Sequence, residues 1–213
     1  MVDRPAADLR VVLRGALVLV ASLLLGACGG GEESTLPVAG IAELQAPYQT
    51  EPYRAFDENM IKSVEEACAE SLRGAFRVEP TLVLADGRGG DRIMLLYGAG
   101  PGETAECLVR IDANGAPSVD SAGSSSGADP AQLGPLALQT SAGGSASGVN
   151  SWSYLHGLIG SDIGGVVISL ADGTNIAASV GGGRFAAWWP GETQPTRILG
   201  FDRAGTQVAN QPY

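Results

Sequence analysis

The stretch RFAAWWPGET (Arg184–Thr193) places two tryptophans side by side and then breaks at a Pro-Gly pair. Successive side chains of a β-strand point to opposite faces, so Phe185 and Trp189 share one face while Trp188 lies on the other. One tryptophan must therefore face away from the core, unless both faces of the strand are covered. We expect Trp189 to pack in the core under the Pro-Gly loop. Trp188 is the candidate for a surface contact with a binding partner.

On both sides of this stretch, residues 133–213 consist of short apolar runs separated by Gly, Asp-Gly or Pro-Gly. The runs are PLALQTS, SWSYLHGL, IGGVVISL, TNIAASV, RFAAWW, TRILGF and TQVA, with a Gly-Ser loop expected at 143–148. Short strands at such even spacing are typical of antiparallel sandwiches and small barrels. The sequence therefore predicts a sandwich-like or small-barrel antiparallel β region over 133–213.

Residues 51–115 show a different organisation, with one amphipathic helix ahead of three apolar runs. Apolar side chains recur at helical spacing from Phe56 to Leu72, acidic side chains lie opposite them, and Arg73-Gly74 is a typical helix end. TLVLADGRGGDRIMLLYG contains two apolar runs joined by a Gly-Asp-rich turn, and AECLVRIDANG adds a third. These patterns predict one helix, beginning between 51 and 57, on an antiparallel meander. Together the two parts predict an α+β fold.

Two stretches lack the apolar periodicity that a packed core needs. Residues 28–50 are rich in Gly, Glu, Ser and Pro, and we expect them to form a flexible tether. Residues 116–132 (APSVDSAGSSSGADPAQ) are small and polar, which predicts a linker or a long surface loop. A formal Gly-x-Ser-x-Gly motif occurs there, but a nucleophile elbow needs a strand before its serine and a helix after it. Whether the parts on either side of the linker form one domain or two is left open.

The first 27 residues have the order of a secretory signal peptide. Three arginines precede the apolar run ALVLVASLLL (Ala16–Leu25), which is too short to span a membrane as a permanent helix. The following residues, Gly26-Ala27-Cys28, complete a resemblance to the bacterial lipoprotein signal, in which the cysteine is lipidated and becomes the first residue. Two or three acyl chains anchor a protein stably. We therefore expect lipid on Cys28 to hold the protein on the extracytoplasmic face of the cell membrane. The alternative is an ordinary signal peptide cut near the same place.

The cysteines agree with an oxidising compartment. If Cys28 carries lipid, Cys68 and Cys107 remain, and a disulfide is their natural pairing. This bond would pin the predicted helix to the third apolar run. The alternative is a pair of free, buried thiols. The sequence has no Cys-x-x-Cys spacing, so it does not indicate a thioredoxin-like redox function.

The C-terminal β region resembles a known group of proteins. The segments VVISLADG, GRFAAWWPG and GFDRAGTQV are similar to those of uncharacterised actinobacterial envelope lipoproteins, which often read Gly-Trp-Phe-Ala-Ala-Trp-Trp-Pro-Gly at this point. Arg184 stands where that group has its first tryptophan. The resemblance covers roughly residues 150–210 and implies an actinobacterial envelope protein. It implies no activity, no catalytic residue and no binding residue.

Composition and motifs argue against several classes of function. A formal net charge of −10 and the lack of a basic stripe argue against nucleic-acid binding. His156, alone in SYLHGL, is more typical of a packed or edge-strand residue than of a ligand. The turn Asp86–Asp91 lacks the ligand order of a calcium loop, and no His or Cys cluster has zinc spacing. We therefore predict no metal site and no cofactor.

Two classes of function remain. We favour a non-catalytic module that binds another envelope protein or a wall component, because the sequence contains no recognisable catalytic set. The alternative is a small hydrolase, or a hydrolase inhibitor, that uses carboxylates in a cleft between the two halves of the chain and acts on envelope polymers. Two facing carboxylates with raised pKa values in a concave pocket would support this alternative.

Overall fold

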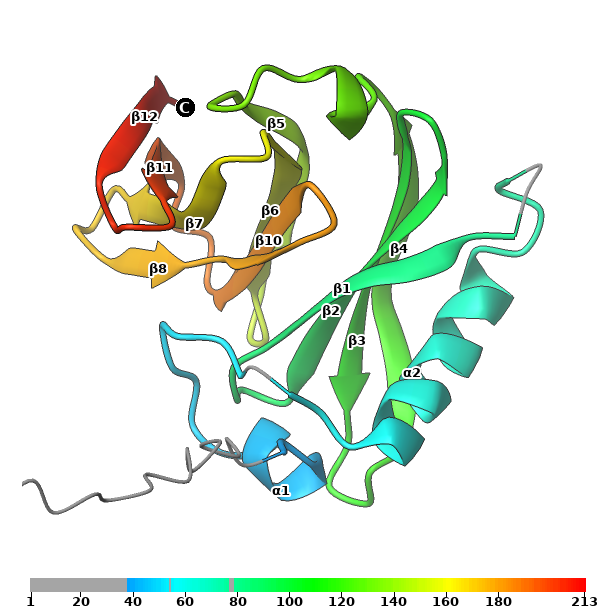
Figure 1. Ribbon diagram of the computed structural model, residues 1–213. Coiled ribbons are helices and arrows are strands. Elements are labelled where there is room, and N and C mark those ends of the chain that lie inside the picture. The colour runs from blue at the N-terminus through cyan, green and yellow to red at the C-terminus, as the bar shows by residue number, and fades with distance from the viewer. Residues whose placement is uncertain (1–37, 54, 77–78) are drawn as a thin grey trace, which may run out of the picture. The chain divides into compact units, whose positions relative to one another are not determined.

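Three four-stranded sheets make up most of the structure, a computed structural model that describes residues 38–53, 55–76 and 79–213 (Figure 1). The first sheet has the strand order β1-β2-β3-β4, the second β5-β6-β10-β9 and the third β12-β11-β7-β8. Every strand pair within these sheets is antiparallel. The structure is mostly antiparallel β with a little helix, which fits the predicted α+β, sandwich-like class.

Most consecutive strands are joined by short turns. The first sheet contains β1 (Thr81–Gly87), β2 (Arg92–Gly100), β3 (Glu103–Ile111) and β4 (Pro117–Ser126). The second contains β5 (Leu138–Ala146), β6 (Trp152–Ile159), β9 (Ser179–Gly181) and β10 (Arg184–Pro190). The third contains β7 (Ile163–Leu170), β8 (Asn175–Ala177), β11 (Pro195–Asp202) and β12 (Gln207–Pro212). The helices are α1 (Ile41–Leu44), α2 (Glu58–Ser71) and the short 3-10 helix η1 (Pro130–Gln132). All these elements belong to one compact unit, so 51–115 and 133–213 are not separate domains.

Helix α2 covers one face of the first sheet. Asp57 is the N-cap of this helix: its Oδ1 accepts hydrogen bonds from the backbone N–H groups of Asn59 and Met60, both at 3.0 Å. Beyond its end, Gly74 adopts a left-handed φ of +80°, which is common after helices. The side chains that α2 and its C-cap bury against the sheet are Met60, Val64, Cys68 and Leu72.

A disulfide joins α2 to β3, which confirms the predicted pairing. Cys68 and Cys107 are both fully buried, and their Cα atoms lie 6.0 Å apart. The two residues are 39 positions apart in the sequence. Closing a loop of this length removes entropy from the unfolded chain, which stabilises the fold by about 4 kcal/mol on the chain-entropy model.

Cys68→Ser should therefore lower the free energy of unfolding by about 4 kcal/mol. Urea unfolding followed by tryptophan fluorescence measures this loss. Reduction of the wild-type protein should cause a similar loss, while the same reductant should leave the variant unchanged. A variant as stable as the oxidised wild type would mean that the bond contributes no net stability.

The second sheet is covered on both faces, because its strands send alternate side chains into two different cores. The core between the first and second sheets contains Met94, Leu96, Leu108, Trp152, Tyr154, Ala186 and Trp188. The core between the second and third sheets contains Leu155, Phe185, Ala187, Trp189, Ile163, Val166, Ile168 and Ile198, among others. Helix α2 and the three sheets thus form successive layers.

The predicted linker at 116–132 is wrong, because most of it forms strand β4 and η1. β4 pairs with β3 from Glu103↔Ser126 to Ile111↔Pro117. Its small side chains permit close packing, since a Cβ at Gly123 would lie only 2.5 Å from Oε1 of Glu106. Backbone pairing with β3 supplies the stabilisation that the side chains of this segment lack. The first sheet consequently has four strands rather than the three expected apolar runs.

The Gly-Ser loop expected at 143–148 is also partly strand. β5 continues through Ala146 and pairs with β6 as far as Trp152. A Cβ at Gly144 would lie 2.6 Å from the ring of Tyr154, so glycine is needed for the aromatic ring to pack against the strand. Glycine here indicates close packing rather than a loop.

The tether expected over 28–50 is wrong for residues 38–50, which pack on the rest of the structure. Leu44 in α1 is fully buried and belongs to the core under α2. Tyr48 packs with its ring edge toward Trp188, with ring centroids 5.2 Å apart. Ala39 pairs with Phe56 in an isolated bridge. Residues 28–37 lie outside the described part of the chain.

Candidate functional site

A buried ion pair lies at the end of the first hairpin strand. Asp86 is near the end of β1 and Arg88 directly follows this strand, and neither side chain is exposed to solvent. Nη2 of Arg88 donates to Oδ1 of Asp86 over 2.5 Å, and Nε donates to Oδ2 over 3.1 Å. The turn DGRGGD, predicted to be a hairpin turn rather than a calcium loop, thus places its arginine inside the protein.

The ion pair connects β1 with four other parts of the fold. Asp86 also accepts a hydrogen bond from Oγ of Ser179 over 2.7 Å and from the backbone N–H of Trp188 over 3.2 Å. Arg88 donates to the backbone oxygens of Thr50 and Ala177, over 2.6 and 2.9 Å. Burial acts to lower the pKa of Arg88, but the Asp86 carboxylate outweighs it and raises the pKa above its usual value. The pair is therefore a structural network that holds β1, the N-terminal segment and β8 to β10 together.

Trp188 is fully buried, so the predicted surface position of this residue is wrong. The strand β10 lies between two cores, and Trp188 enters the one shared with the first sheet. Trp189 lies in the core shared with the third sheet, as expected. Its Nε1 donates to the backbone oxygen of Thr193 over 2.9 Å, beneath the Pro-Gly loop. Neither tryptophan is placed to contact a partner directly.

Tyr48 should make the protein sensitive to alkaline pH. Burial raises its pKa from 10.0 to about 12, and its hydroxyl donates to the backbone oxygen of Trp188 over 3.2 Å. Because the pKa is higher in the folded state, the stabilisation from neutral Tyr48 is complete below pH 10 and is lost as the pH rises from 10 toward 12. The loss should be on the order of 2 kcal/mol.

Unfolding free energies of the wild type and Tyr48→Phe at a series of alkaline pH values test this. The variant lacks the ionising hydroxyl and should lose less stability across the same interval. An equal loss in both proteins would assign the alkaline sensitivity to other tyrosines.

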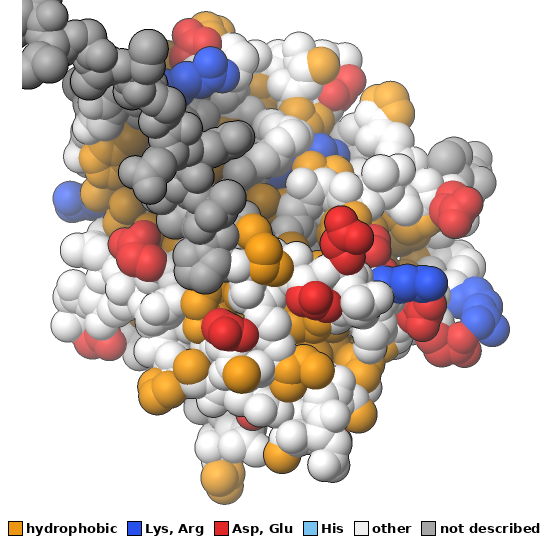
Figure 2. Space-filling view, turned by 60° about the horizontal axis from the view of Figure 1, so that its bottom comes forward, with side chains coloured by type: hydrophobic (Ala, Val, Ile, Leu, Met, Phe, Trp, Pro, Cys, Tyr) orange, Lys and Arg blue, Asp and Glu red, His pale blue; other side chains and the backbone are white. Residues whose placement is uncertain are grey.

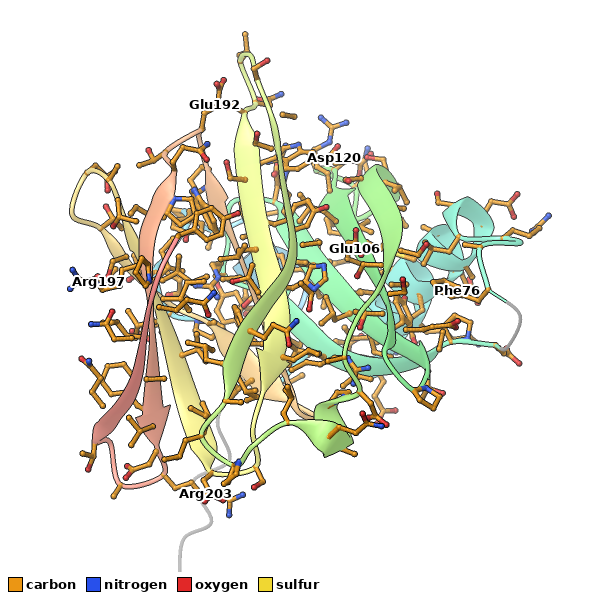
Figure 3. All side chains as sticks on the ribbon, turned by 90° about the horizontal axis from the view of Figure 1, so that it is seen from above. Phe76, Glu106, Asp120, Glu192, Arg197 and Arg203 are labelled. Atoms are coloured by element: carbon orange, nitrogen blue, oxygen red, sulfur yellow. A yellow bond between two sulfur atoms is a disulfide. The ribbon has the colours of Figure 1, made fainter. Side chains whose placement is uncertain are left out.

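A second buried polar cluster lies between the first and second sheets. His156 on β6 is completely buried, which confirms that it is a packed residue. Its Nε2 lies 3.5 Å from Oε2 of Glu106 on β3, and the Tyr154 hydroxyl donates to Oε1 of Glu106 over 3.4 Å. Figure 3 shows Glu106 between the strands of these two sheets. Because the cluster has little contact with solvent, it is not an accessible reaction centre.

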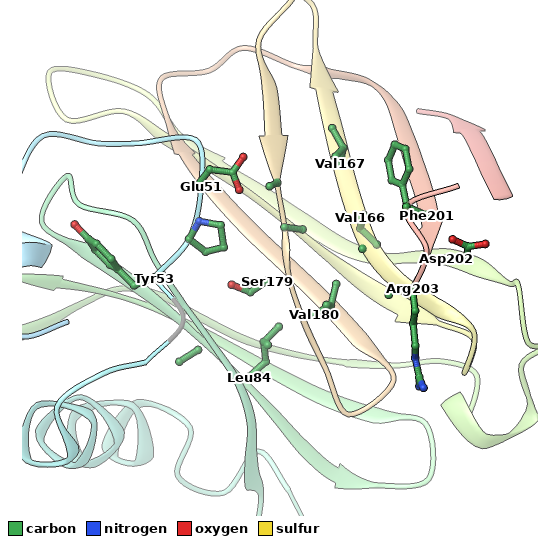
Figure 4. Close-up of a pocket in the computed structure, with 17 residues that line it drawn as sticks. Glu51, Tyr53, Leu84, Val166, Val167, Ser179, Val180, Phe201, Asp202 and Arg203 are labelled. Atoms are coloured by element: carbon green, nitrogen blue, oxygen red, sulfur yellow. The ribbon is translucent and has the colours of Figure 1, made fainter. Parts of the chain in front are cut away.

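A groove of about 1030 Å³ opens where the second and third sheets diverge (Figure 4). It arises because β8 leaves the third sheet after Ala177 and the chain enters the second sheet as β9. The two sheets separate at this point, next to the outer edge of β1. Residues that line the groove are Glu51–Tyr53, Leu84, Ala85, Gly164–Val167, Ala177–Val180, Phe201–Arg203 and Gly205.

The charged side chains of the groove lie at its ends. Glu51 and Arg203 are both exposed and sit on opposite sides of the opening (Figure 4). Asp202 is held in the turn before β12, because its Oδ1 accepts from the backbone N–H groups of Ala204 and Thr206, over 2.9 and 2.8 Å. Glu51 and Asp202 are the two carboxylates among the described residues that line the groove.

The sequence did not predict the groove, because its lining comes from five separate segments of the chain. The two consecutive glycines Gly164-Gly165 were the available signal, since glycine within a strand often marks close approach of another backbone. The predicted lipidation site Cys28 lies outside the described residues. Within them, no helix has both the length and the apolar character that crossing a membrane requires. The described residues also contain no group of three or more side chains placed to hold a metal ion.

The surface electrostatics follow the acidic composition. Figure 2 shows acidic side chains spread over the face that carries α1. No continuous run of basic side chains crosses the described part of that face.

The chain was compared with protein-family models, with curated proteins and with solved structures, and no match was found in any of the three. The resemblance to actinobacterial envelope lipoproteins therefore stays a prediction.

Proposed function

We propose that this protein is a lipid-anchored envelope protein that works as a non-catalytic binding module, with the groove beside β7 and β9 as its binding surface. Lipid on Cys28 would keep this surface on the extracytoplasmic face of the membrane. The partner would be another envelope protein or a wall component. The groove is the observation that carries this proposal, because it is large, open and lined mainly by small and apolar residues.

The polar interior of the protein also supports binding rather than catalysis. Asp86 and Arg88 are fully buried and bonded to one another. Glu106 and His156 are enclosed between two sheets. A catalytic acid or base must lie within hydrogen-bond reach of a substrate. These four side chains therefore serve the structure, and the groove itself offers mainly shape, apolar surface and backbone groups.

Photo-crosslinking in living cells tests the proposal. A photoreactive amino acid replaces Val167, whose half-buried side chain lines the groove, in the full-length protein. The matched control carries it at Val149, which is fully exposed and does not line the groove. We expect a discrete product of defined mass from position 167 and none from position 149, and mass spectrometry then identifies the captured molecule.

Two results would contradict the proposal. Equal labelling from both positions would mean that the groove has no preferred partner. Turnover of wall polymers or peptides by the purified lipoprotein would favour the hydrolase alternative. An inactive protein with position-specific capture supports a binding module.

A further inference from the structure

The walls of the groove are unpaired strand edges. β8 pairs with β7 only from Val167 to Ser169, so the first half of β7 has β11 on one side and no paired strand on the other. A single hydrogen bond, from Ala178 N–H to the backbone oxygen of Val166 over 2.8 Å, continues the pairing by one step. Among the described strands, β9 pairs only with β10, and β1 only with β2, although the Tyr53 N–H donates to the backbone oxygen of Gly87 at the end of β1 over 2.8 Å. Three edges thus border one depression, and an exposed edge is a template for another strand.

The edge of β7 is also open to the approach of a second backbone. Gly164 is exposed and Gly165 is half-buried, so neither residue covers the strand with a side chain. A Cβ at Gly164 would lie 3.0 Å from Cα of Arg203, so this glycine also makes room for the turn after β11. The ladder with β11 has a bulge at this point, between Phe201 and Asp202. Glycines and bulges are common where a strand receives a close neighbour. If β8 continued further, it would pair with the first half of β7. That position is empty of any described strand and is accessible from the groove.

Apolar side chains and charges define what could occupy this position. Val167 on β7, Val180 on β9 and Leu84 on β1, all half-buried, provide apolar surface along the groove. Glu51 lies at one end, and the exposed Arg203 lies at the other, next to Asp202, whose Oδ1 accepts from two backbone N–H groups of its turn (Figure 4). This distribution of charge complements a short chain with a basic group at one end and an acidic group at the other. An alternating apolar pattern between its ends would match the pleat of a strand.

We infer that the groove binds an extended polypeptide segment of a partner protein, which adds as a strand to the free edge of β7. The segment would need about four residues to pair with the first half of β7, with a basic residue toward Glu51 and an acidic residue or carboxyl terminus toward Arg203. Main-chain hydrogen bonds would supply affinity, and the apolar surface would select alternate side chains. This inference rests on the proposed binding function and assigns it a class of ligand.

Synthetic peptides and the intact lipoprotein in detergent micelles test the inference. The probes are peptides of about ten residues in which apolar residues alternate with Ser or Thr, with Lys at one end and Glu at the other, in both orders. Binding is measured by fluorescence anisotropy. For the peptide order that binds, N-methylation of one alternating set of amides should weaken binding at least about tenfold, while methylation of the other set should have little effect.

Charge reversal tests the orientation of the peptide. The double variant Glu51→Arg with Arg203→Glu should reverse the preference between the two peptide orders by about fivefold to tenfold. Both side chains are exposed, so the variant should fold.

Val180→Arg should block the groove, and Val149→Arg is its control on an exposed site outside the groove. Val180 is partly buried, so Val180→Arg could fail to fold. In that case the charge-reversal variant, whose two sites are exposed, still tests the inference.

Other outcomes would overturn the inference. Equal effects of both N-methylation sets would exclude strand addition. Binding of purified wall glycan fragments, lost in the groove variants while no peptide binds, would keep the binding function and reject a peptide ligand. Self-association that disappears in the groove variants would identify a second copy as the occupant. Position-specific capture in cells remains the separate test of the proposed function, so its failure is distinguishable from failure of the peptide model.

Discussion

Asp86→Ala should lower the free energy of unfolding by about 3 to 5 kcal/mol. The substitution leaves the Arg88 guanidinium buried without its carboxylate, since neither side chain reaches solvent. The hydroxyl of Ser179 and the backbone N–H of Trp188 also lose their acceptor. A loss of this size is a large part of the stability of an ordinary domain.

Urea unfolding followed by tryptophan fluorescence measures this effect. Asp172→Ala is a matched control, because Asp172 occupies the same tetrapeptide, Leu-Ala-Asp-Gly, in an exposed turn after β7. That control should leave the unfolding midpoint close to the wild-type value. A double variant, Asp86→Ala with Arg88→Leu, should recover part of the loss, because no unpaired charge stays buried. Recovery should be incomplete, since the backbone oxygens of Thr50 and Ala177 lose their donor.

A small effect of Asp86→Ala on stability would contradict the prediction that the buried ion pair stabilises the fold. If Asp86→Ala changes stability by less than about 1 kcal/mol, the site must admit water or rearrange so that Arg88 is solvated. Equal effects of Asp86→Ala and Asp172→Ala would likewise show that burial of the pair does not determine its contribution.

Cys28→Ala should abolish membrane attachment of the mature protein. Alanine has no thiol to carry the acyl chains, and the ten-residue apolar run of the signal is too short to be a stable transmembrane helix. Stable attachment by lipid requires at least two acyl chains or a second signal, so loss of the modified residue leaves no strong anchor. The variant should therefore move from the membrane fraction to the medium.

Cell fractionation, metabolic labelling with palmitate and intact-mass analysis measure this outcome. Cys68→Ser is the control, because it removes the disulfide but should leave attachment and palmitate labelling unchanged. An unaltered membrane fraction for Cys28→Ala would reject the anchor and favour an ordinary signal peptide cut near the same place. That result would leave the proposed binding function untouched, but it would reject lipid anchoring as the reason for its location.

Short-range side-chain patterns predicted several elements of this fold. The apolar residues at helical spacing up to Leu72 all face the same neighbouring layer, so their spacing alone predicted the helix. The structure places this helix, α2, at Glu58–Ser71. Alternating apolar runs with glycine-rich breaks predicted antiparallel strands in the C-terminal part, where the third sheet and β10 are found. The disulfide could be predicted from the number of cysteines and the expected compartment. Each of these signals depends on local sequence or on a simple count.

The segments 117–126 and 143–146 could not be predicted in this way, because their small polar side chains carry no apolar pattern. Their strands form through backbone pairing with β3 and β6. Glycine at 123 and 144 lets the large side chains of the partner strands pack closely. A composition that is typical of a linker therefore also suits a strand that lies against bulky neighbours.

Long-range contacts decided the environment of the chemically interesting residues. Trp188 became a core residue only because the first sheet covers the second face of β10. Asp86 and Asp172 share a tetrapeptide, yet Asp86 meets partners 93 and 102 positions away at Ser179 and Trp188. The groove likewise exists only where β8 leaves one sheet and β9 enters another. Alternation along a strand determines which side chains share a face, but burial and accessibility depend on what distant segments place over that face.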